Sequence, residues 1–307
     1  MKIRFWGVRG SIPSPGASTV KYGGNTSCVE LRYGRDDEHL VIIDAGTGIK
    51  PLGDHLAKTQ VPRGPVEARI FLTHTHWDHI MGFPFFTPIF IPGTRLEFFS
   101  PVNYEDESLE SIIGNQLSYR HFPIRQSELS ASITYRELRE ETLELEDGLT
   151  VTTKFLNHPV LCLGYRFEHE GKVVCTVYDN EPFRNVFPTD PDDPDFDEVA
   201  ASEGEDAAAE ENRKLMRFYS GADLLIHDTQ YTLREYVASK VGWGHTPFEV
   251  AINNAHKARV ARLMFFHHDP LRSDDELDSL LESYSIQIRA KSALELSIAR
   301  EGDVIEV

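Results

Sequence analysis

The sequence predicts an α/β fold in which two β-sheets lie between outer layers of helices. Short runs of β-branched, aromatic and aliphatic residues recur along the 307-residue chain, and helical patterns separate several of them. Polar side chains directly follow many of these runs, which is where an α/β architecture places its chemistry. With 40% hydrophobic residues, including 18 Phe and 11 Tyr, the chain has ample material for a well-packed core.

Each expected element follows from the apolar pattern, taken from the N-terminus onward. Strands are expected at residues 2–8, 28–33 and 39–44, and the segment Asp44-Ala-Gly-Thr-Gly closes the third strand before a helix at 49–58. Further strands are expected at 68–73, 96–99, 149–155, 161–167, 172–178, 224–227 and 263–266, and further helices at 207–219, 247–258 and 274–283. The sequence has no internal repeats, so we expect a single domain over residues 1–307.

One stretch of the chain is strongly acidic. The formal net charge is −18, and residues 190–211 carry eleven acidic and no basic side chains, so the balance without them is −7. Prolines and a tract of small residues accompany this charge, and residues 184–211 are therefore expected to form a solvated, mobile insertion loop. A gate that repels polyanions is the functional alternative. No basic patch balances the acidic stretch, which disfavours long nucleic acid as a partner.

The composition also indicates the setting in which the protein works. Cys28, Cys162 and Cys175 lie far apart in apolar strand-like runs without a CxxC pair, so we expect buried thiols rather than disulfides. The first residues lack the apolar region of a signal peptide, and no run of about 18 apolar residues is present to span a bilayer. We therefore expect a cytoplasmic protein without a membrane partner.

A dense cluster of metal-binding residue types follows the strand expected at 68–73. His74, His76, Asp78 and His79 fall within six residues, and His74 and His76, two apart in an extended segment, present their imidazoles on the same face. Asp78 and His79 come where the chain must turn, and they can reach a second ion beside the first. Imidazole suits Zn(II), Mn(II) or Fe(II), and a carboxylate adds a hard oxygen ligand. The spacing therefore predicts a metal-dependent hydrolase.

Further polar residues recur at the ends of later expected strands. One such residue would mean little, but five in series after the histidine cluster indicate a shared site. They are His158, Asp179, Asp228, His245 and His267.

The order His-x-His-x-Asp-His, followed by His, Asp and His, resembles the binuclear site of the metallo-β-lactamase superfamily, and the resemblance covers nearly the whole chain. It is closest to the phosphodiesterase branch, which includes ribonuclease Z and cyclic-nucleotide phosphodiesterases. Three segments carry this part of the resemblance: Gly-Gly-Asn25-Thr-Ser27, His227-Asp228-Thr-Gln-Tyr and Gly244-His245-Thr. The resemblance implies a four-layer αββα sandwich.

The resemblance also implies which residues bind two divalent metal ions, with zinc expected first and manganese or iron as alternatives. One ion would be held by His74, His76 and His158, and the other by Asp78, His79 and His267, with Asp179 bridging them. His267 is preferred to the alternative ligand His268 because it directly follows a strand. Asp44 would either orient a ligand histidine or serve only in its turn.

Such a site explains how a phosphodiester could be cleaved. Two cations about 3.5–4 Å apart share a water molecule and lower its pKa, so that a metal-bridged hydroxide is available near neutral pH. His245 could protonate the leaving alkoxide as general acid while Asp228 accepts the hydrogen bond from its other ring nitrogen. Asp78 is expected to be essential for turnover. A structural histidine beside two glycines is the alternative for His245.

The favoured function is hydrolysis of a small nucleotide diester, such as a cyclic nucleotide. A ribonuclease Z-like nuclease is the main alternative, but that family commonly holds transfer RNA with a flexible, often basic arm between the residues matching His158 and Asp179. Only twenty positions separate these residues here, and the long insertion is acidic. A lactonase, a thioesterase or a ligand sensor without turnover remain further alternatives. The resemblance makes a homodimer possible.

Overall fold

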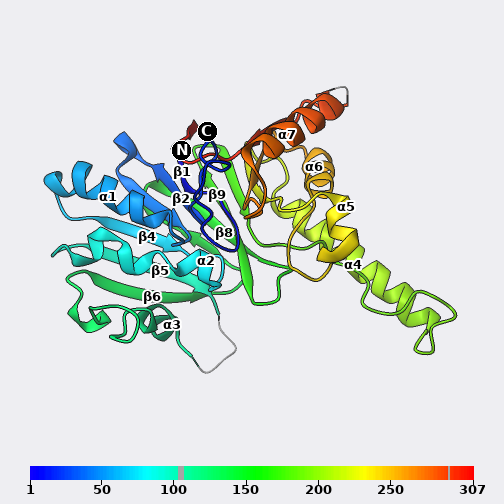
Figure 1. Ribbon diagram of the computed structural model, residues 1–307, viewed down its shortest axis with the longest axis horizontal. Helices are drawn as coiled ribbons and strands as arrows, with labels where there is room; N and C mark the ends of the chain where they lie inside the picture. The colour runs from blue at the N-terminus through cyan, green and yellow to red at the C-terminus, as the bar shows by residue number, and fades with distance from the viewer. Residues whose placement is uncertain (103–106, 290) are drawn as a thin grey trace.

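The first of two β-sheets is built mainly from the N-terminal half of the chain. The computed structural model describes residues 1–102, 107–289 and 291–307, and Figure 1 shows how their helices and strands are arranged. The strand order of this sheet is β14-β1-β2-β3-β4-β5-β6. Its strands are β1 (Lys2–Gly7), β2 (Cys28–Tyr33), β3 (His39–Ile43), β4 (Glu67–Phe71), β5 (Arg95–Pro101), β6 (Ser132–Leu138) and β14 (Val304–Glu306). Neighbours from β3 to β6 are parallel, and the other neighbours are antiparallel.

The second sheet has the same plan, with the order β13-β12-β11-β10-β9-β8-β7. Its strands are β7 (Thr142–Glu144), β8 (Thr150–Leu156), β9 (Cys162–His169), β10 (Lys172–Val177), β11 (Leu224–Asp228), β12 (Arg262–Phe266) and β13 (Glu295–Ile298). Neighbours from β10 to β13 are parallel, and those from β7 to β10 are antiparallel. In sheets with parallel strands, ligands bind outside the carboxyl ends of the strands, which is where β4, β10, β11 and β12 lead here.

An apolar core fills the space between the two sheets. It includes Val41, Ile43 and Phe71 from the first sheet and Ile226 and Phe266 from the second, all of which are buried. Side chains of successive strand residues point to opposite faces, so each sheet has a second apolar face that must also be covered.

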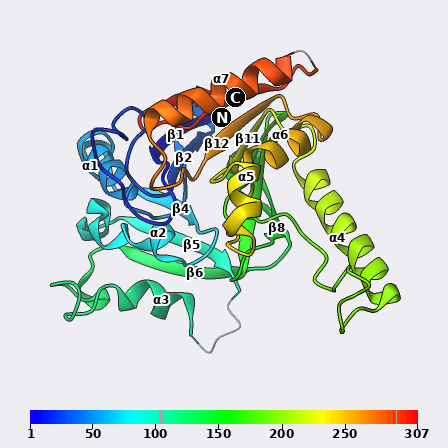
Figure 2. The ribbon, with the colours of Figure 1, turned by 45° about the vertical axis from the view of Figure 1, so that its right-hand side comes forward.

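Helices cover these outer faces. The helices are α1 (Ile49–Thr59), α2 (Trp77–Ile80), α3 (Leu109–Asn115), α4 (Glu198–Phe218), α5 (Leu233–Glu235), α6 (Phe248–Lys257) and α7 (Asp274–Arg289). Leu52 of α1 packs with Ile42 on the first sheet, and Ala255 of α6 packs with Leu225 and Leu263 on the second. Figure 2 shows α1 beside the first sheet and α4 and α6 beside the second. The fold is therefore the expected four-layer αββα sandwich.

Several short or polar elements were not expected from the sequence. These elements are β6, β7, β13, β14 and α3, and the strand expected at 96–99 is only the centre of β5. In β6, exposed and half-buried residues alternate and Leu138 alone is buried, so its apolar signal is weak. Strands of this kind form because a neighbouring strand supplies their hydrogen bonds, and the local sequence does not record that pairing.

The expected acidic loop is wrong over residues 198–211, because these residues form the first two thirds of α4. Alanine has the highest helix propensity, and α4 contains five alanines. Asp197 caps the helix by accepting a hydrogen bond from the Ala200 amide, and Glu210 pairs with Arg213 and Arg217. The acidic face is exposed, which is why charge alone suggested a loop. Residues 184–197 do lie outside helices and strands, and Figures 1 and 2 show α4 projecting from the body.

The remaining expectations for the whole chain concern its cysteines, membrane-spanning helices and the number of its domains. Cys28, Cys162 and Cys175 are free and buried, as expected. Within the described ranges, none of the helices combines the length and the apolar character that a bilayer crossing needs. Because the core between the sheets draws on both halves of the chain, we propose that residues 1–307 fold as one domain.

Candidate metal centre

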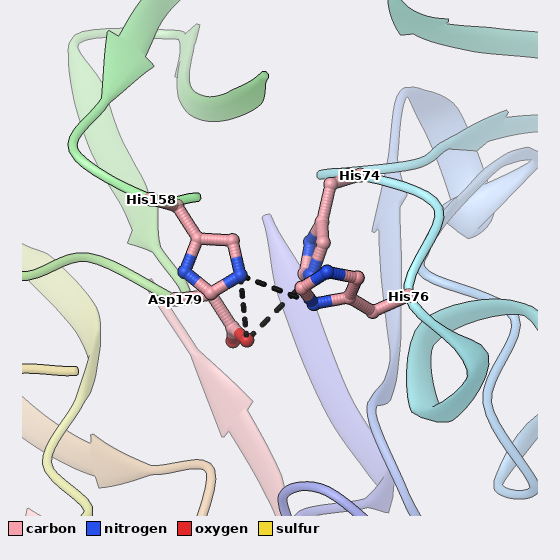
Figure 3. A group of neighbouring side chains, drawn as sticks. All are labelled: His74, His76, His158 and Asp179. Atoms are coloured by element: carbon pink, nitrogen blue, oxygen red, sulfur yellow. Dashed lines mark hydrogen bonds and ion pairs between the residues drawn. The ribbon is translucent and has the colours of Figure 1, made fainter. Parts of the chain in front are cut away.

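All seven expected metal ligands come together in two adjoining groups at one edge of the sandwich. The ligand atoms within each group lie within 4.8 Å of one another. The first group is His74, His76, His158 and Asp179, shown in Figure 3, and the second is Asp78, His79 and His267. Residues that are almost 200 positions apart in the sequence thus share one site.

Asp179 lies between the two groups, with one carboxylate oxygen directed to each. Its Oδ2 atom is 3.6 Å from Nε2 of His74 and 3.8 Å from Nε2 of His158. Its Oδ1 atom is 3.4 Å from Nε2 of His79 and 3.2 Å from Nε2 of His267. A carboxylate in this position can contact two cations at once.

The segment after β4 presents its four polar residues in two ways. His74 and His76 lie in the extended link, with ring centroids 4.5 Å apart, so they share a face as their spacing predicts. Asp78 and His79 lie in α2, which begins at Trp77 and turns these two side chains toward the second group. The change from extended chain to helix therefore divides one short segment between two groups.

Backbone strain marks two of the ligand positions. Asp179 and His267 have φ angles of 48° and 60°, and Asp44, just after β3, has 62°. Residues other than glycine rarely adopt positive φ angles, and such strain occurs most often at functional sites. Here the left-handed backbone turns each side chain inward at the end of its strand.

Hydrogen bonds fix which ring nitrogen each histidine presents. His158 donates from Nδ1 to the Gly244 carbonyl at 3.1 Å, so its Nε2 lone pair is directed to His76. His79 donates from Nδ1 to Asp44 Oδ2 at 2.7 Å, which leaves its Nε2 atom facing His267. Histidines that bind metals in proteins are usually held in this way.

Asp44 is the centre of a buried network behind the metal ligands. Besides His79, it accepts hydrogen bonds from the Thr73 amide at 2.8 Å, the Thr73 hydroxyl at 3.0 Å and the Ser27 hydroxyl at 2.9 Å. Ser27 belongs to the Gly-Gly-Asn-Thr-Ser segment, which therefore supports the centre without reaching into it. Of the two roles open for Asp44, the contacts favour orientation of a ligand histidine.

The protonation states also suit metal ions. Burial lowers the pKa values of His74 and His76, and it lowers the pKa of His158 to about 4. In the second group, burial alone would raise the pKa of Asp78, but the charge of His79 and a hydrogen bond from His267 lower it instead. Burial alone would lower the pKa of His79, but the nearby carboxylates of Asp179, Asp78 and Asp44 raise it, so His79 must release a proton when it binds a metal ion. Three neutral imidazoles beside an ionised carboxylate are the forms in which these side chains bind metals.

The donor set therefore fits divalent cations. The Nε2 atom of His74 and the Oδ1 atom of Asp179 are buried and make no hydrogen bond within the described part of the chain. A buried polar atom without a partner is costly, so each such atom needs an explanation. Ring nitrogens also face one another across 3.1–3.2 Å in His158 and His76 and in His79 and His267. Both members of such a pair are close enough to bind one cation.

His245 and Asp228 form the expected pair beside the centre. The Nδ1 atom of His245 donates to Asp228 Oδ2 at 2.9 Å. Burial disfavours the charged imidazole, but the carboxylate of Asp228 outweighs this effect and raises the pKa of His245 to about 9. His245 also groups with Asp179 and His267 within 4.8 Å, so a role as a metal ligand competes with the role of proton donor.

His268 lies outside the centre. Its Nε2 atom donates to the Ala299 carbonyl at 3.0 Å, and it belongs to none of the ligand groups found among the described residues. The geometry thus favours His267 over His268.

Two contributors were missed from the sequence. The backbone amide of Ser11 donates to Asp78 Oδ2 at 2.7 Å, and no side-chain pattern could have indicated a backbone donor. Glu181 is buried and binds the segment that carries His245 through the Gly242 and Gly244 amides. Its position two residues after Asp179 was the only signal available.

Comparisons with known proteins agree with this geometry. Residues 22–174 match the family model of the metallo-beta-lactamase superfamily. The chain is 26% identical to ribonuclease Z of Lactococcus lactis subsp. lactis, over 87% of this chain and 88% of that protein. It is 27% identical to ribonuclease BN of Cronobacter sakazakii, over 92% of this chain and 93% of that protein.

Solved structures share the fold along the whole chain. The metallo-beta-lactamase fold protein YhfI from Bacillus subtilis aligns with a TM-score of 0.62 at 17% identity, covering 100% of this chain and 98% of that one. The short form of human tRNase Z aligns with 0.61 at 20% identity, covering 100% and 99%. A diphosphatase from the PhnP family aligns with 0.61 at 17% identity, covering 100% and 97%. These structures show the shared fold, while the family match, the curated relatives and the histidine and aspartate groups together make the protein a metal-dependent hydrolase of the metallo-beta-lactamase superfamily.

Proposed function

We propose that the protein is a phosphodiesterase that uses two divalent metal ions to hydrolyse a small nucleotide diester, with a cyclic nucleotide as the favoured substrate. The position of Asp179 carries this proposal. Its two oxygens are directed to separate histidine groups, which supports a pair of ions rather than one.

The residues that would hold the ions are the two groups described above. Zinc is the first choice because imidazole and carboxylate donors suit it, and manganese or iron could use the same set. When bound, two such ions supply a hydroxide nucleophile near neutral pH and withdraw charge from a phosphoryl oxygen. Asp179, with one oxygen directed to each group, would hold the ions side by side.

Residues of the chain itself would protonate the leaving group. Asp228 fixes the His245 ring by accepting its Nδ1 proton at 2.9 Å, so that Nε2 is the atom that can carry a proton to a departing alkoxide. The same carboxylate stabilises the protonated ring. Tyr231 flanks His245 with ring centroids 5.9 Å apart.

A ribonuclease Z-like activity is the second candidate, because the curated relatives above are named ribonuclease Z and ribonuclease BN. Two features of this chain oppose a transfer RNA substrate. The segment between His158 and Asp179 consists of little more than the β9–β10 hairpin, which leaves no room for a basic arm. The projecting α4 has an acidic, exposed surface, which repels long nucleic acid.

A panel of substrates combined with metal analysis tests the proposal. The metal content of the purified protein is measured, and turnover is assayed with bis(p-nitrophenyl) phosphate, cyclic nucleotides, a precursor transfer RNA, a lactone and a thioester. We expect two equivalents of metal and turnover of diesters. Preferred turnover of the lactone or the thioester would contradict the proposal, and preferred cleavage of the transfer RNA would favour the second candidate. Metal-loaded protein that binds nucleotides without turning over any substrate would indicate a sensor.

Two substitutions test the assigned roles. Asp78→Ala should abolish turnover. His245→Ala should slow diesters with poor leaving groups far more than nitrophenyl esters, because only the former need a donated proton. Equal losses together with a lost equivalent of metal would make His245 a ligand instead of the general acid.

A further inference from the structure

The segment that carries His245 also presents an exposed tryptophan. After α5, Tyr236–Lys240 form one π-helical turn, a local geometry that occurs often at functional sites. Trp243 follows, and 56% of its surface is exposed. It directly precedes Gly244, whose carbonyl holds His158, and stands two residues before His245. An exposed indole thus stands next in the chain to residues that hold and line the metal centre.

The backbone on both sides of Trp243 is held rigidly. The buried carboxylate of Glu181 accepts hydrogen bonds from the Gly242 amide at 2.8 Å and the Gly244 amide at 3.0 Å. Both glycines have positive φ angles, 86° and 84°, and a Cβ atom on Gly244 would lie 2.3 Å from the ring of His158. The backbone on each side of Trp243 is therefore fixed relative to His158.

Lys240 is held against this tryptophan and not against an acid. Its Nζ atom lies 3.7 Å from the centroid of Trp243 and 5.2 Å from that of Tyr231. In the described residues it forms no ion pair, although the chain has 49 acidic side chains, and nearby Arg272 is paired with Glu235. Because the ring of Tyr231 in turn lies 5.9 Å from that of His245, this ammonium without a carboxylate partner remains available for an anionic ligand that extends from the centre.

We propose that Trp243 and Lys240 form the nucleotide-recognition pair of this centre: the base of the substrate stacks on Trp243, and Lys240 meets the phosphate charge. This inference rests on the proposed phosphodiesterase function and explains how the protein recognises the part of the substrate that the metal ions do not contact. Base–aromatic stacking accepts any base because every base has a flat π-face. The enzyme thus selects nucleotides over plain alkyl or sugar diesters without distinguishing one base from another.

The test compares substrates with and without a base. Adenosine 3′,5′-cyclic phosphate, adenosine 2′,3′-cyclic phosphate and the dinucleotide ApA are each paired with the compound in which hydrogen replaces the base, and kcat/KM is measured for both. Trp243→Ala should lower kcat/KM for the base-bearing member about ten-fold more than for its base-free partner. Trp243→Phe should restore most of this preference. Phe187→Ala, an exposed aromatic residue after β10 that touches none of the ligands, is the control and should change neither.

Lys240→Met tests the second half of the pair. It should raise KM about two- to five-fold, as expected for a partly exposed charge, and it should make KM less sensitive to salt. Far-ultraviolet circular dichroism and metal content establish that each variant retains the fold and the ions.

The failures of the inference and of the proposed function are distinguishable. If the wild type cleaves no diester, the proposed function is wrong. If the wild type cleaves bis(p-nitrophenyl) phosphate but prefers no base-bearing substrate, only this inference fails. It also fails if Trp243→Ala affects both members of a pair equally, or if Trp77→Ala, at the other exposed tryptophan, removes the base preference and Trp243→Ala does not.

Discussion

Asp44 binds four donors behind the metal centre, and the ring of His79 depends on it. In Asp44→Asn, the amide cannot match the carboxylate as acceptor for Nδ1 of His79. Partners of this kind typically contribute 10–100-fold to metal affinity, so we expect about that loss at the second ion. Calorimetric zinc titration measures it. Asp54→Asn, at a carboxylate that binds Lys50 and Thr87 outside the centre, should leave both affinities unchanged.

Glu181 should contribute to stability through the segment it anchors. Glu181→Ala leaves the buried Gly244 amide without its acceptor, which costs about 1–3 kcal/mol in the free energy of unfolding. Urea denaturation measures the loss, and hydrogen exchange should show faster exchange at Gly242 and Gly244. Glu282→Ala, an exposed glutamate on α7, should have little effect. A loss no larger than that of Glu282→Ala would contradict the anchoring role.

Single residues differ greatly in how well the sequence reveals them. His74 and His76 were predictable because two positions in an extended chain determine the direction of both side chains. Glu181 was not, because its amide partners lie about sixty positions away and its burial depends on how β10 and the later segment pack. The Ser11 amide carries no side-chain signal at all.

At the scale of elements, α4 provides a direct test of the corrected loop. Ala207→Pro should disrupt the first half of this helix, because proline removes a backbone donor and clashes with the preceding turn. We expect a smaller helical signal in circular dichroism and unchanged turnover of bis(p-nitrophenyl) phosphate. Thr189→Pro, in the stretch without regular structure, is the matched control. An unchanged helical signal in Ala207→Pro would instead support the loop expected from the sequence.

The contact between α5 and the segment before α7 should depend on pH. Burial alone would raise the pKa of Glu235, but hydrogen bonds from Arg272 and Thr232 outweigh it and lower the pKa from 4.5 to about 2. Because the folded value is the lower one, Glu235 stabilises the fold above pH 4.5, and this contribution is lost as the pH falls toward 2. Glu235→Gln should therefore lower Tm relative to the wild type at pH 6, and the difference should shrink by pH 3. A difference that stays constant would contradict the assignment.

Elements were predictable where one face is continuously apolar, as in β2 and β3. Elements were not predictable where pairing with a neighbouring strand determines the structure, or where the helix propensity of some residues outweighs the charge of others. β6 depends on β5 for its hydrogen bonds, and in α4 the alanines outweigh the charges that suggested a loop.

For the whole molecule, metal ions and folding should be coupled. The centre joins segments from both sheets, so ions that bind only the folded chain stabilise it, by about 4 kcal/mol when the free ion exceeds Kd a thousand-fold. Chelation should lower Tm in calorimetry, and added zinc should restore it. Asp179→Ala should reduce this response because both groups share Asp179. Identical Tm values with and without chelator would contradict a resident metal centre.

The left-handed backbone at Asp44, Asp179 and His267 limits how this protein can diversify. Asparagine, aspartate and glycine tolerate that conformation best, and β-branched residues tolerate it worst. In a mutant library designed to change the metal preference, few variants with substitutions at these three positions would therefore fold. Lys240 and Trp243 are not among the residues with positive φ angles, so new substrate preferences should arise at such positions while the metal ligands stay unaltered.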